Sequence, residues 1–158
     1  MANVMRWRYG ETASVVAAVD RDTIIYLGDL LWLDGNRAKP ASALSPGGNA
    51  AATRANFAAK FLGVAMQQSP AGDDRPIRVA TSGVFEMDTP ASTFELGGWV
   101  GVAIDSATGR PKNQQVEKVT EATQAIGRIA ARSERTTTKV LVAICSTVMA
   151  GGVAGTTT

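Results

Sequence analysis

The stretch FLGVAMQQSPAGDDRPIRVATSGVFEM, from Phe61 to Met87, decides the fold. It contains three apolar runs, and in the second and third of them apolar residues fall on alternate positions, a period of two that is typical of strands with one buried face. Pro70, Gly72 and Pro76 lie in the link between the first two runs, where proline and glycine favour turns. We therefore expect a three-stranded antiparallel meander that serves as framework.

Further strands are predicted before this stretch. Apolar and β-branched residues predict strands at 14–20, 23–26 and 30–33. Asp34-Gly35 is a strong hairpin signal, and the returning strand is expected at 37–40, where Pro40 ends it.

The rest of the chain contains one expected helix and more strands. Residues 49–60 are rich in alanine and predict a short helix with Asn49 as its N-cap. We expect a loop at 89–92 and a second hairpin turn at 105–109. The remaining expected strands are 94–104, 110–119, 125–130 and 139–145, with a charged link at 132–135.

Two parts of the chain contain similar segments in the same order. Leu27–Gly35 is echoed by Leu96–Asp105, Phe61–Ala65 by Ala125–Ala130, and Ile77–Ala80 by Val140–Ala143. We expect two similar β units that close onto one core as a compact β-barrel or roll, with Gly63 and Gly127 at bulges or sharp bends. Chance similarity in a chain rich in glycine and alanine is the alternative.

Length and composition indicate a single globular domain. The chain has 158 residues, of which 45% are hydrophobic and 19% charged. The low share of charge fits either a surface partly covered by a partner or simply a small Ala-rich domain. The net charge of +2 is too small to predict a nucleic-acid partner. Residues 110–139 hold seven basic and three acidic side chains, which a solvated strand face explains.

The single cysteine, Cys145, excludes an internal disulfide and lies in an apolar run, so we expect a buried thiol. No apolar run approaches the roughly 20 residues of a membrane helix, and the N-terminus lacks the apolar region of a secretion signal. We expect a soluble protein made in a cytoplasm, with no membrane partner.

The two ends of the chain have the composition of contact arms. We divide the sequence into an N-terminal arm at 1–11, a single β domain at 12–146, and a flexible Gly/Thr tail at 147–158. Aromatic and arginine side chains are enriched where proteins dock, and they are concentrated in one place. The candidate interface residues are Met5, Arg6, Trp7, Arg8 and Tyr9. A terminal strand packed on its own domain is the alternative.

The sequence lacks the usual residues of catalysis. It has no histidine, and so lacks the commonest general base and metal ligand. No phosphate-binding glycine motif occurs, and the carboxylate pairs Asp73-Asp74 and Asp20 with Asp22 lie in predicted turns. Trp32 and Trp99 fall at corresponding places in the two halves and are expected in the core. We expect no enzyme, no cofactor and no metal.

Several phrases of the chain resemble the small capsid decoration, or cement, proteins of tailed bacteriophages. They are LGDLLWLDGNRAKPAS, KFLGVAMQQSPAGDDRPIRVATSGVFEM, FELGGWVGVAIDSATG, QAIGRIA and TTKVLVAI, and the resemblance extends over roughly residues 23–144. The resemblance rests on framework motifs and carries no catalytic residue.

The resemblance implies a homotrimer on the outer surface of a virion, made in the cytoplasm of a bacterial host, that bridges neighbouring subunits of the major capsid protein. The residues 5–9 and the C-terminal tail would make the contacts, with strand addition as one mode. The alternative is a β-barrel module that recognises a carbohydrate or a host-surface molecule with Trp32 or Trp99 as a stacking platform. An enzyme that uses carboxylates alone is a third possibility.

Overall fold

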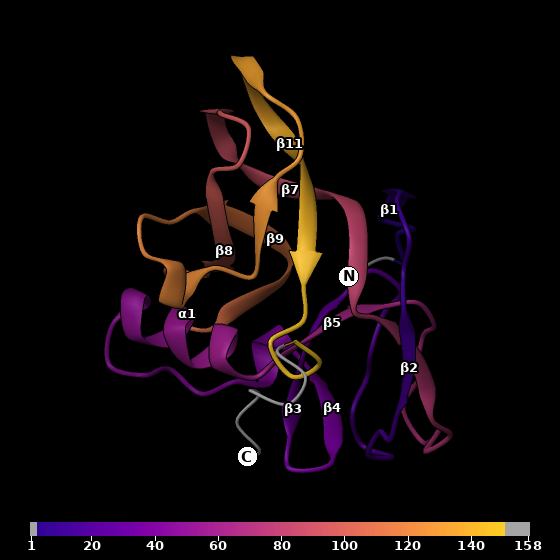
Figure 1. The fold of residues 1–158 in the computed structure, drawn as a ribbon. Helices are drawn as coiled ribbons and strands as arrows, with labels where there is room; N and C mark the ends of the chain where they lie inside the picture. Colours follow the sequence, from indigo (N-terminus) through magenta and orange to yellow (C-terminus); the bar gives the residue numbers. More distant parts are fainter. Residues whose placement is uncertain (1–2, 151–158) are drawn as a thin grey trace.

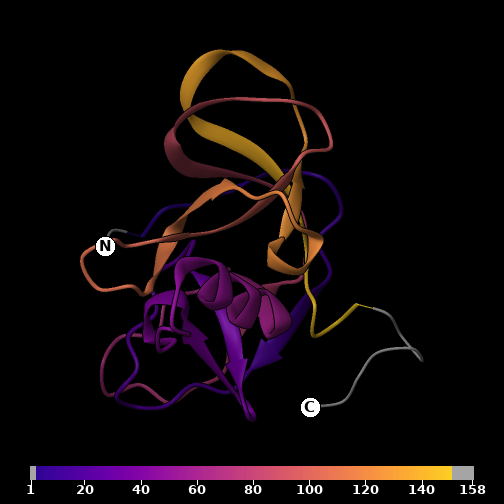
Figure 2. The ribbon, with the colours of Figure 1, turned by 90° about the vertical axis from the view of Figure 1, so that its left-hand side faces the viewer.

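In the computed structural model, which describes residues 3–150, the chain is mainly β and holds one α-helix in that range. The strands form two units stacked one above the other, with the earlier half of the chain below the later half (Figures 1 and 2). The first unit holds β2 (Ser14–Ala17), β3 (Leu30–Asp34), β4 (Arg37–Pro40), β5 (Phe61–Ala65) and β6 (Ile77–Ala80). The second holds β7 (Ser82–Phe94), β8 (Trp99–Ile104), β9 (Pro111–Lys118), β10 (Gly127–Ile129) and β11 (Ser133–Cys145), and β1 (Trp7–Tyr9) joins its edge.

The two units have the same topology. The strand order is β2-β6-β5-β3-β4 in the first unit and β7-β11-β10-β8-β9 in the second, so each strand has a counterpart in the other unit. One parallel contact closes each unit into a small barrel: Ala18 with Arg37 in the first, and Asp88 with Gln115 in the second. The predicted fold class, a compact mainly β structure of two similar units with one short helix, is confirmed.

Gly63 and Gly127 occupy equivalent places in the two ladders. A methyl group on Gly63 would overlap the carbonyl of Ala80 on β6, and one on Gly127 would overlap the carbonyl of Ala143 on β11. The register between β3 and β5 also shifts beside Gly63, where φ is +156°, so the predicted bulge is confirmed there. The register around Gly127 is unbroken, so that glycine serves the close approach of two strands alone.

The core has two parts because the first unit is buried on both faces of its central strand. All five residues of β5 are buried. Leu62 and Ala65 face a cluster inside the first barrel, whereas Phe61 and Val64 belong to a larger cluster that continues into the second unit. The outer face of the first barrel is therefore the surface on which the second unit packs.

The helix α1 (Ala50–Ala59) lies between the two units in Figure 2. The Asn49 side chain accepts a hydrogen bond from the Ala52 N–H, which confirms the predicted N-cap. Arg54 reaches the second unit, where it binds Glu117 and donates to Gln124 at 2.9 Å. Within residues 3–150, no helix has the length and apolar character that crossing a membrane requires.

The predicted meander is correct for two of its three strands. β5 and β6 pair antiparallel, but the chain then crosses to the other sheet, where β7 pairs with β1 and β11. The crossing occurs at Thr81, whose N–H donates to the Ala13 carbonyl, and at Gly83, where φ is +121°. Alternation of apolar residues predicts a strand but not the strand on which it pairs.

Three other local predictions are wrong. Residues 23–26 form no strand and make only one bridge, between Ile25 and Ser69. The expected loop at 89–92 lies inside β7, and most of the expected link at 132–135 belongs to β11. These two long strands pair with each other, so tertiary pairing overrides the turn signal of Pro90.

Cys145 is exposed, not buried as predicted. It ends β11, where Val142 and Ile144 face the core and Ala143 between them faces outward, as Cys145 does. Beyond it, the N–H groups of Thr147 and Val148 donate to the Phe61 carbonyl at 3.0 and 3.2 Å. The rest of the predicted tail, 151–158, lies outside the described residues.

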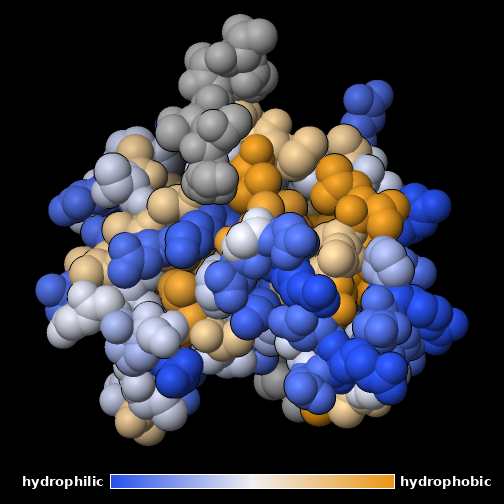
Figure 3. Space-filling view, turned by 90° about the horizontal axis from the view of Figure 1, so that it is seen from below, coloured by the Kyte–Doolittle hydropathy of each residue, from blue (hydrophilic) through white to orange (hydrophobic). Residues whose placement is uncertain are grey.

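Seen from below, the first unit has a mixed surface with hydrophobic side chains gathered in patches (Figure 3).

We predict that Gly63→Ala and Gly127→Ala each lower the free energy of unfolding by about 2 kcal/mol, because the added methyl forces two paired strands apart. Urea denaturation followed by tryptophan fluorescence measures the loss. Gly98→Ala is the control, since its new methyl meets the Glu95 carbonyl oxygen at 3.2 Å, in tight but tolerable contact. An equal loss in all three variants would contradict the role of the strand approach.

Candidate functional site

The predicted N-terminal arm is docked on its own domain. Trp7 lies opposite Phe85 in the pairing of β1 with β7, and the Glu86 N–H donates to the Arg6 carbonyl at 2.8 Å. The Val4 N–H donates to the Leu27 carbonyl at 2.9 Å. The structure thus has the packed terminal strand that was the alternative to a free arm. That this segment also contacts a partner stays a prediction.

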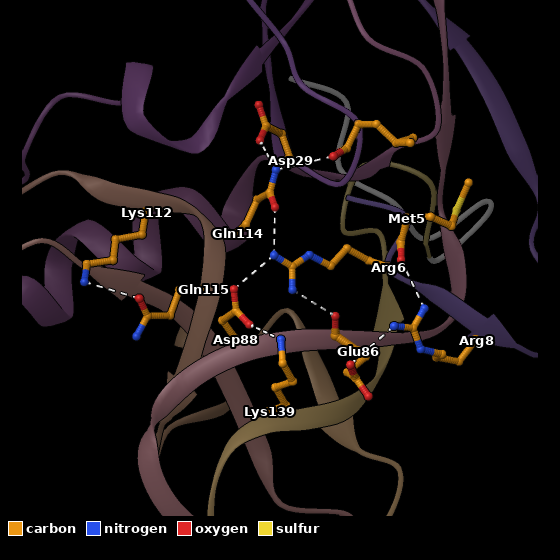
Figure 4. Close-up of polar contacts among 11 residues, drawn as sticks. Met5, Arg6, Arg8, Asp29, Glu86, Asp88, Lys112, Gln114, Gln115 and Lys139 are labelled. Atoms are coloured by element: carbon orange, nitrogen blue, oxygen red, sulfur yellow. Dashed lines mark hydrogen bonds and ion pairs between the residues drawn. The ribbon is translucent and has the colours of Figure 1, made fainter. Parts of the chain in front are cut away.

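Arg6 separates from the other four candidate residues because it is only 5% exposed. Its Nη2 donates to Asp88 Oδ2 at 3.0 Å and to Gln114 Oε1 at 2.8 Å, and its Nη1 lies 3.4 Å from the Glu86 carbonyl (Figure 4). The guanidinium lies beside the edge of β7, between the part of β7 that pairs with β1 at Phe85 and the part that pairs with β9 at Asp88. Arg6 is therefore a structural anchor and not an exposed contact residue.

Gln114 extends this network into the first unit. Its Nε2 donates to Asp29 Oδ1 at 2.9 Å and to the Leu27 carbonyl at 3.3 Å. Asp29 is fully buried, and its Oδ2 accepts the Tyr26 N–H at 2.9 Å. Burial raises the pKa of Asp29, and the hydrogen bonds from Gln114 and Tyr26 partly oppose that shift. Through Gln114, one connected set of polar groups links the N-terminal segment to both units.

Asp88 has the opposite electrostatic setting. It accepts from Arg6 and also binds Lys139 Nζ at 2.9 Å, so two cations share one carboxylate. The hydrogen bond from Arg6 is the largest cause of a lowered pKa for Asp88, and Lys139 adds to it. Asp88 is thus held as an anion beside Arg6.

Arg8 covers the outer edge of β1. Because the Arg6 carbonyl points toward β7, the carbonyls of Met5 and Trp7 point away from it. Arg8 Nη1 donates to the Met5 carbonyl at 3.0 Å and to the Trp7 carbonyl at 3.2 Å. Its Nη2 lies 3.3 Å from Glu86 Oε1, which holds the guanidinium in place (Figure 4). The backbone acceptors of this edge are therefore already occupied.

The remaining three candidate residues expose apolar surface. Met5 is 49% exposed, Trp7 38% and Tyr9 50%. The Trp7 Nε1 donates to the Gly10 carbonyl at 3.2 Å, which orients the indole beside Gly83. Large aromatic side chains fixed in this way lose little conformational freedom when a partner covers them.

A hollow of about 470 Å³, lined mainly by polar residues, adjoins the network. It is lined by Ser42, Asp88, Asp105, Thr108, Arg110, Pro111, Lys112, Asn113, Gln114 and Gln115. Both of its carboxylates have partners, since Asp88 binds two cations and Asp105 accepts the Ala107 N–H at 2.9 Å. Its size suits a small ligand, but the hollow contains no aromatic side chain on which a sugar ring could stack.

The two tryptophans of the echo are not equivalent. Trp32 is 6% exposed and donates to the Pro40 carbonyl at 3.0 Å, so its predicted place in the core is confirmed. Trp99 is half-buried, lies under the Arg128 guanidinium at 5.3 Å, and borders a hollow of about 280 Å³, so its predicted place in the core is wrong. The ladders show that the two tryptophans are not counterparts, because Trp99 takes the position of Leu30, a residue that is fully buried in the first unit.

Two of the carboxylates that the sequence offered for chemistry, Asp73 and Asp20, are paired with arginines. The Asp73 carboxylate accepts hydrogen bonds from the side chain and from the backbone N–H of Arg75, and these bonds lower the pKa of Asp73 to about 2. Asp20 lies 2.8 Å from Arg37. Within residues 3–150, no group of three or more Cys, Asp or Glu side chains is placed to hold a metal ion.

Comparison with known proteins adds no relative. A scan against protein-family models finds no match, and a search of curated proteins finds none either.

The network residues Asp29, Asp88, Gln114 and Lys139 were not identified from the sequence. They come from four separate segments, and each is an ordinary polar residue in its local context. Only Arg6 carried a signal, as a cation inside an apolar and aromatic segment. Its burial depends on partners that no local pattern indicates.

Arg6→Ala should lower the free energy of unfolding by about 3 kcal/mol, because it leaves Asp88 and Gln114 without their shared donor. Arg8→Ala is the matched control, since its ion pair is exposed and should contribute less than about 1 kcal/mol. Urea denaturation of both variants measures the difference. Equal losses would mean that burial of the Arg6 guanidinium carries no special weight.

The difference in the free energy of unfolding between the wild type and the Asp88→Asn variant should become smaller as the pH falls. A carboxylate with a lowered folded-state pKa stabilises the fold above its unfolded value of 3.8, and this contribution disappears as the pH drops through the folded value. Asp29, whose pKa is raised, makes stability change with pH in the opposite direction. It does so in both proteins, so its effect cancels in the difference. Denaturation at several values between pH 7 and pH 3 measures the gap. A constant gap would contradict the lowered pKa.

Proposed function

We propose that the protein is a structural virion component, a decoration or cement protein that binds the outside of a phage head. It acts without catalysis or cofactor, and it stabilises contacts between subunits of the major capsid protein. In this proposal it works as a homotrimer on the outer surface of the capsid, after synthesis in the bacterial host cytoplasm. The resemblance of the phrases between residues 23 and 144 motivates the proposal.

The observation that carries the proposal is the construction of the N-terminal segment. Met5, Trp7 and Tyr9 expose apolar surface on a strand that Arg6 anchors to both units. Exposed aromatic residues on a rigid base are the features that interfaces use as binding anchors. A segment with these side chains, held in one conformation, supports docking on a protein surface.

The proposed action is mechanical. A protein that binds the expanded shell but not the loosened one stabilises the shell by mass action. Each contact can be weak, because a trimer that engages several capsid subunits gains effective concentration from its linked copies. Small interfaces repeated over a lattice are then sufficient.

A second candidate function, carbohydrate recognition, is favoured by one observation. Trp99 is half-exposed at the rim of a hollow, where an indole ring can stack on a sugar. Arg128 covers this ring in the structure and would have to move aside. Trp32 does not support the candidate, because it is buried and hydrogen-bonded.

One experiment separates the two functions. We predict that Trp7→Ala weakens binding to purified expanded heads that lack this protein by about 30-fold, the equivalent of about 2 kcal/mol for an interface anchor. Trp99→Ala, a matched loss of a partly exposed indole, should leave head binding unchanged. Co-sedimentation with the heads measures both, and light scattering of the free protein tests for the trimer.

The result that would overturn the proposal is equally clear. Wild-type protein that ignores expanded heads and binds glycans on an array, with the binding lost in Trp99→Ala, would establish the carbohydrate function instead. Thermal unfolding of each variant shows whether the domain is still folded.

A further inference from the structure

The duplicated fold leaves one of two equivalent strand edges uncovered. In the second unit, β11 lies on one edge of β7, and β1 covers the start of the other edge at Phe85 and Val84. The counterpart of this edge in the first unit belongs to β2. Among residues 3–150, β2 pairs with β6 and, just past its end, touches β4 at Ala18, but no strand covers Ser14 to Val16 on that side.

The backbone groups on this edge point outward. Val16 lies opposite Arg78, whose carbonyl accepts from Met66 on the far side of β6. Val16 and Arg78 therefore form a non-hydrogen-bonded pair, and the Val16 N–H and C=O point away from β6. Ser14, two residues earlier, has the same orientation. The edge thus offers two donors and two acceptors in the arrangement that receives an antiparallel strand.

Within residues 3–150, no charged side chain of β2 protects this edge from pairing, and β4 covers it only from Ala18 onward. On β1 the outward carbonyls are occupied by Arg8, one of the charged side chains with which proteins protect open edges. On β2 the residues are Ser14, Val15, Val16 and Ala17, without a charge, and Val16 is 64% exposed. A short, uncharged edge with an exposed valine is a pairing surface that the chain leaves unprotected.

We propose that the β2 edge pairs with the β2 edge of a second copy of this chain. An antiparallel pairing centred on Val15 places Ser14 of each copy opposite Val16 of the other. All outward donors and acceptors of Ser14 and Val16 are then satisfied, and the two exposed Val16 side chains are partly covered. The edge fits a second copy because the same few residues supply both halves of the pairing.

This contact is twofold and short, and it goes beyond the proposed function. Four backbone hydrogen bonds and one pair of valines make a weak interface, smaller than those of stable dimers. A twofold contact is also distinct from the threefold contact of the proposed trimer, so it would join one trimer to the next. The test below uses purified protein and does not depend on capsid binding.

A disulfide trap tests the register directly. In chains carrying Cys145→Ser, which removes the exposed native thiol, one preparation receives Ser14→Cys and the other Val16→Cys. In a hydrogen-bonded antiparallel pair the Cα atoms lie about 5.5 Å apart, a spacing that a disulfide spans. Mixing the two preparations with oxidised glutathione should therefore give a mixed disulfide at least about tenfold faster than random collision.

Two controls decide the outcome. Ser14→Cys mixed with Leu96→Cys, at a 70% exposed site outside the edge, gives the collision rate. Val16→Pro removes only an outward N–H, which an edge strand tolerates; it should abolish concentration-dependent association in light scattering, whereas Val16→Thr should keep it. Equal rates for the two mixtures would overturn the proposal. If Val16→Pro then still weakened binding to expanded heads, the edge would belong to a capsid segment instead.

Discussion

The buried guanidinium of Arg6 is the interaction on which the assembly of this molecule depends. A cation removed from water needs acceptors within the protein, and those of Arg6 come from β7 and β9 and bind its two Nη atoms, whereas its buried Nε has no partner. Gln114 passes the connection on to Asp29 in the first unit. A single side chain near the N-terminus therefore adds to the backbone pairing that holds β1 and links the two barrels beside their shared apolar core.

The two units have the same strand pairing and register, but they carry different side chains at equivalent positions. Asp88, which binds Arg6, has Ala18 as its counterpart in the first unit. The first unit consequently has no carboxylate at this place to hold an arginine, and no strand covers its equivalent edge within the described residues. The two similar units thus differ at equivalent edges: one edge is covered by β1, which exposes aromatic side chains, and the other is open within the described residues.

Local chemistry explains most of the elements that could be predicted. Asp34-Gly35 gives the β3–β4 hairpin with Gly35 in the left-handed region, and Asn49 caps α1. The sequence similarity between the two halves of the chain predicted two similar units, because strands in equivalent places need residues that allow the same close contacts. The Arg6 network was not predictable, since its members are distant in sequence and no single one of them signals burial.

The sequence by itself determined where turns, caps and half-buried strands occur, because these depend on side chains within a few residues of one another. Beyond the predicted β3–β4 and β5–β6 pairs, the tertiary structure decided which strands pair; it sent β7 to the second sheet and turned Cys145 outward at the end of β11. It likewise buried Trp32 and left Trp99 half-exposed. Alternation assigns residues to two faces of a strand, but only the packing of whole units determines which face meets water.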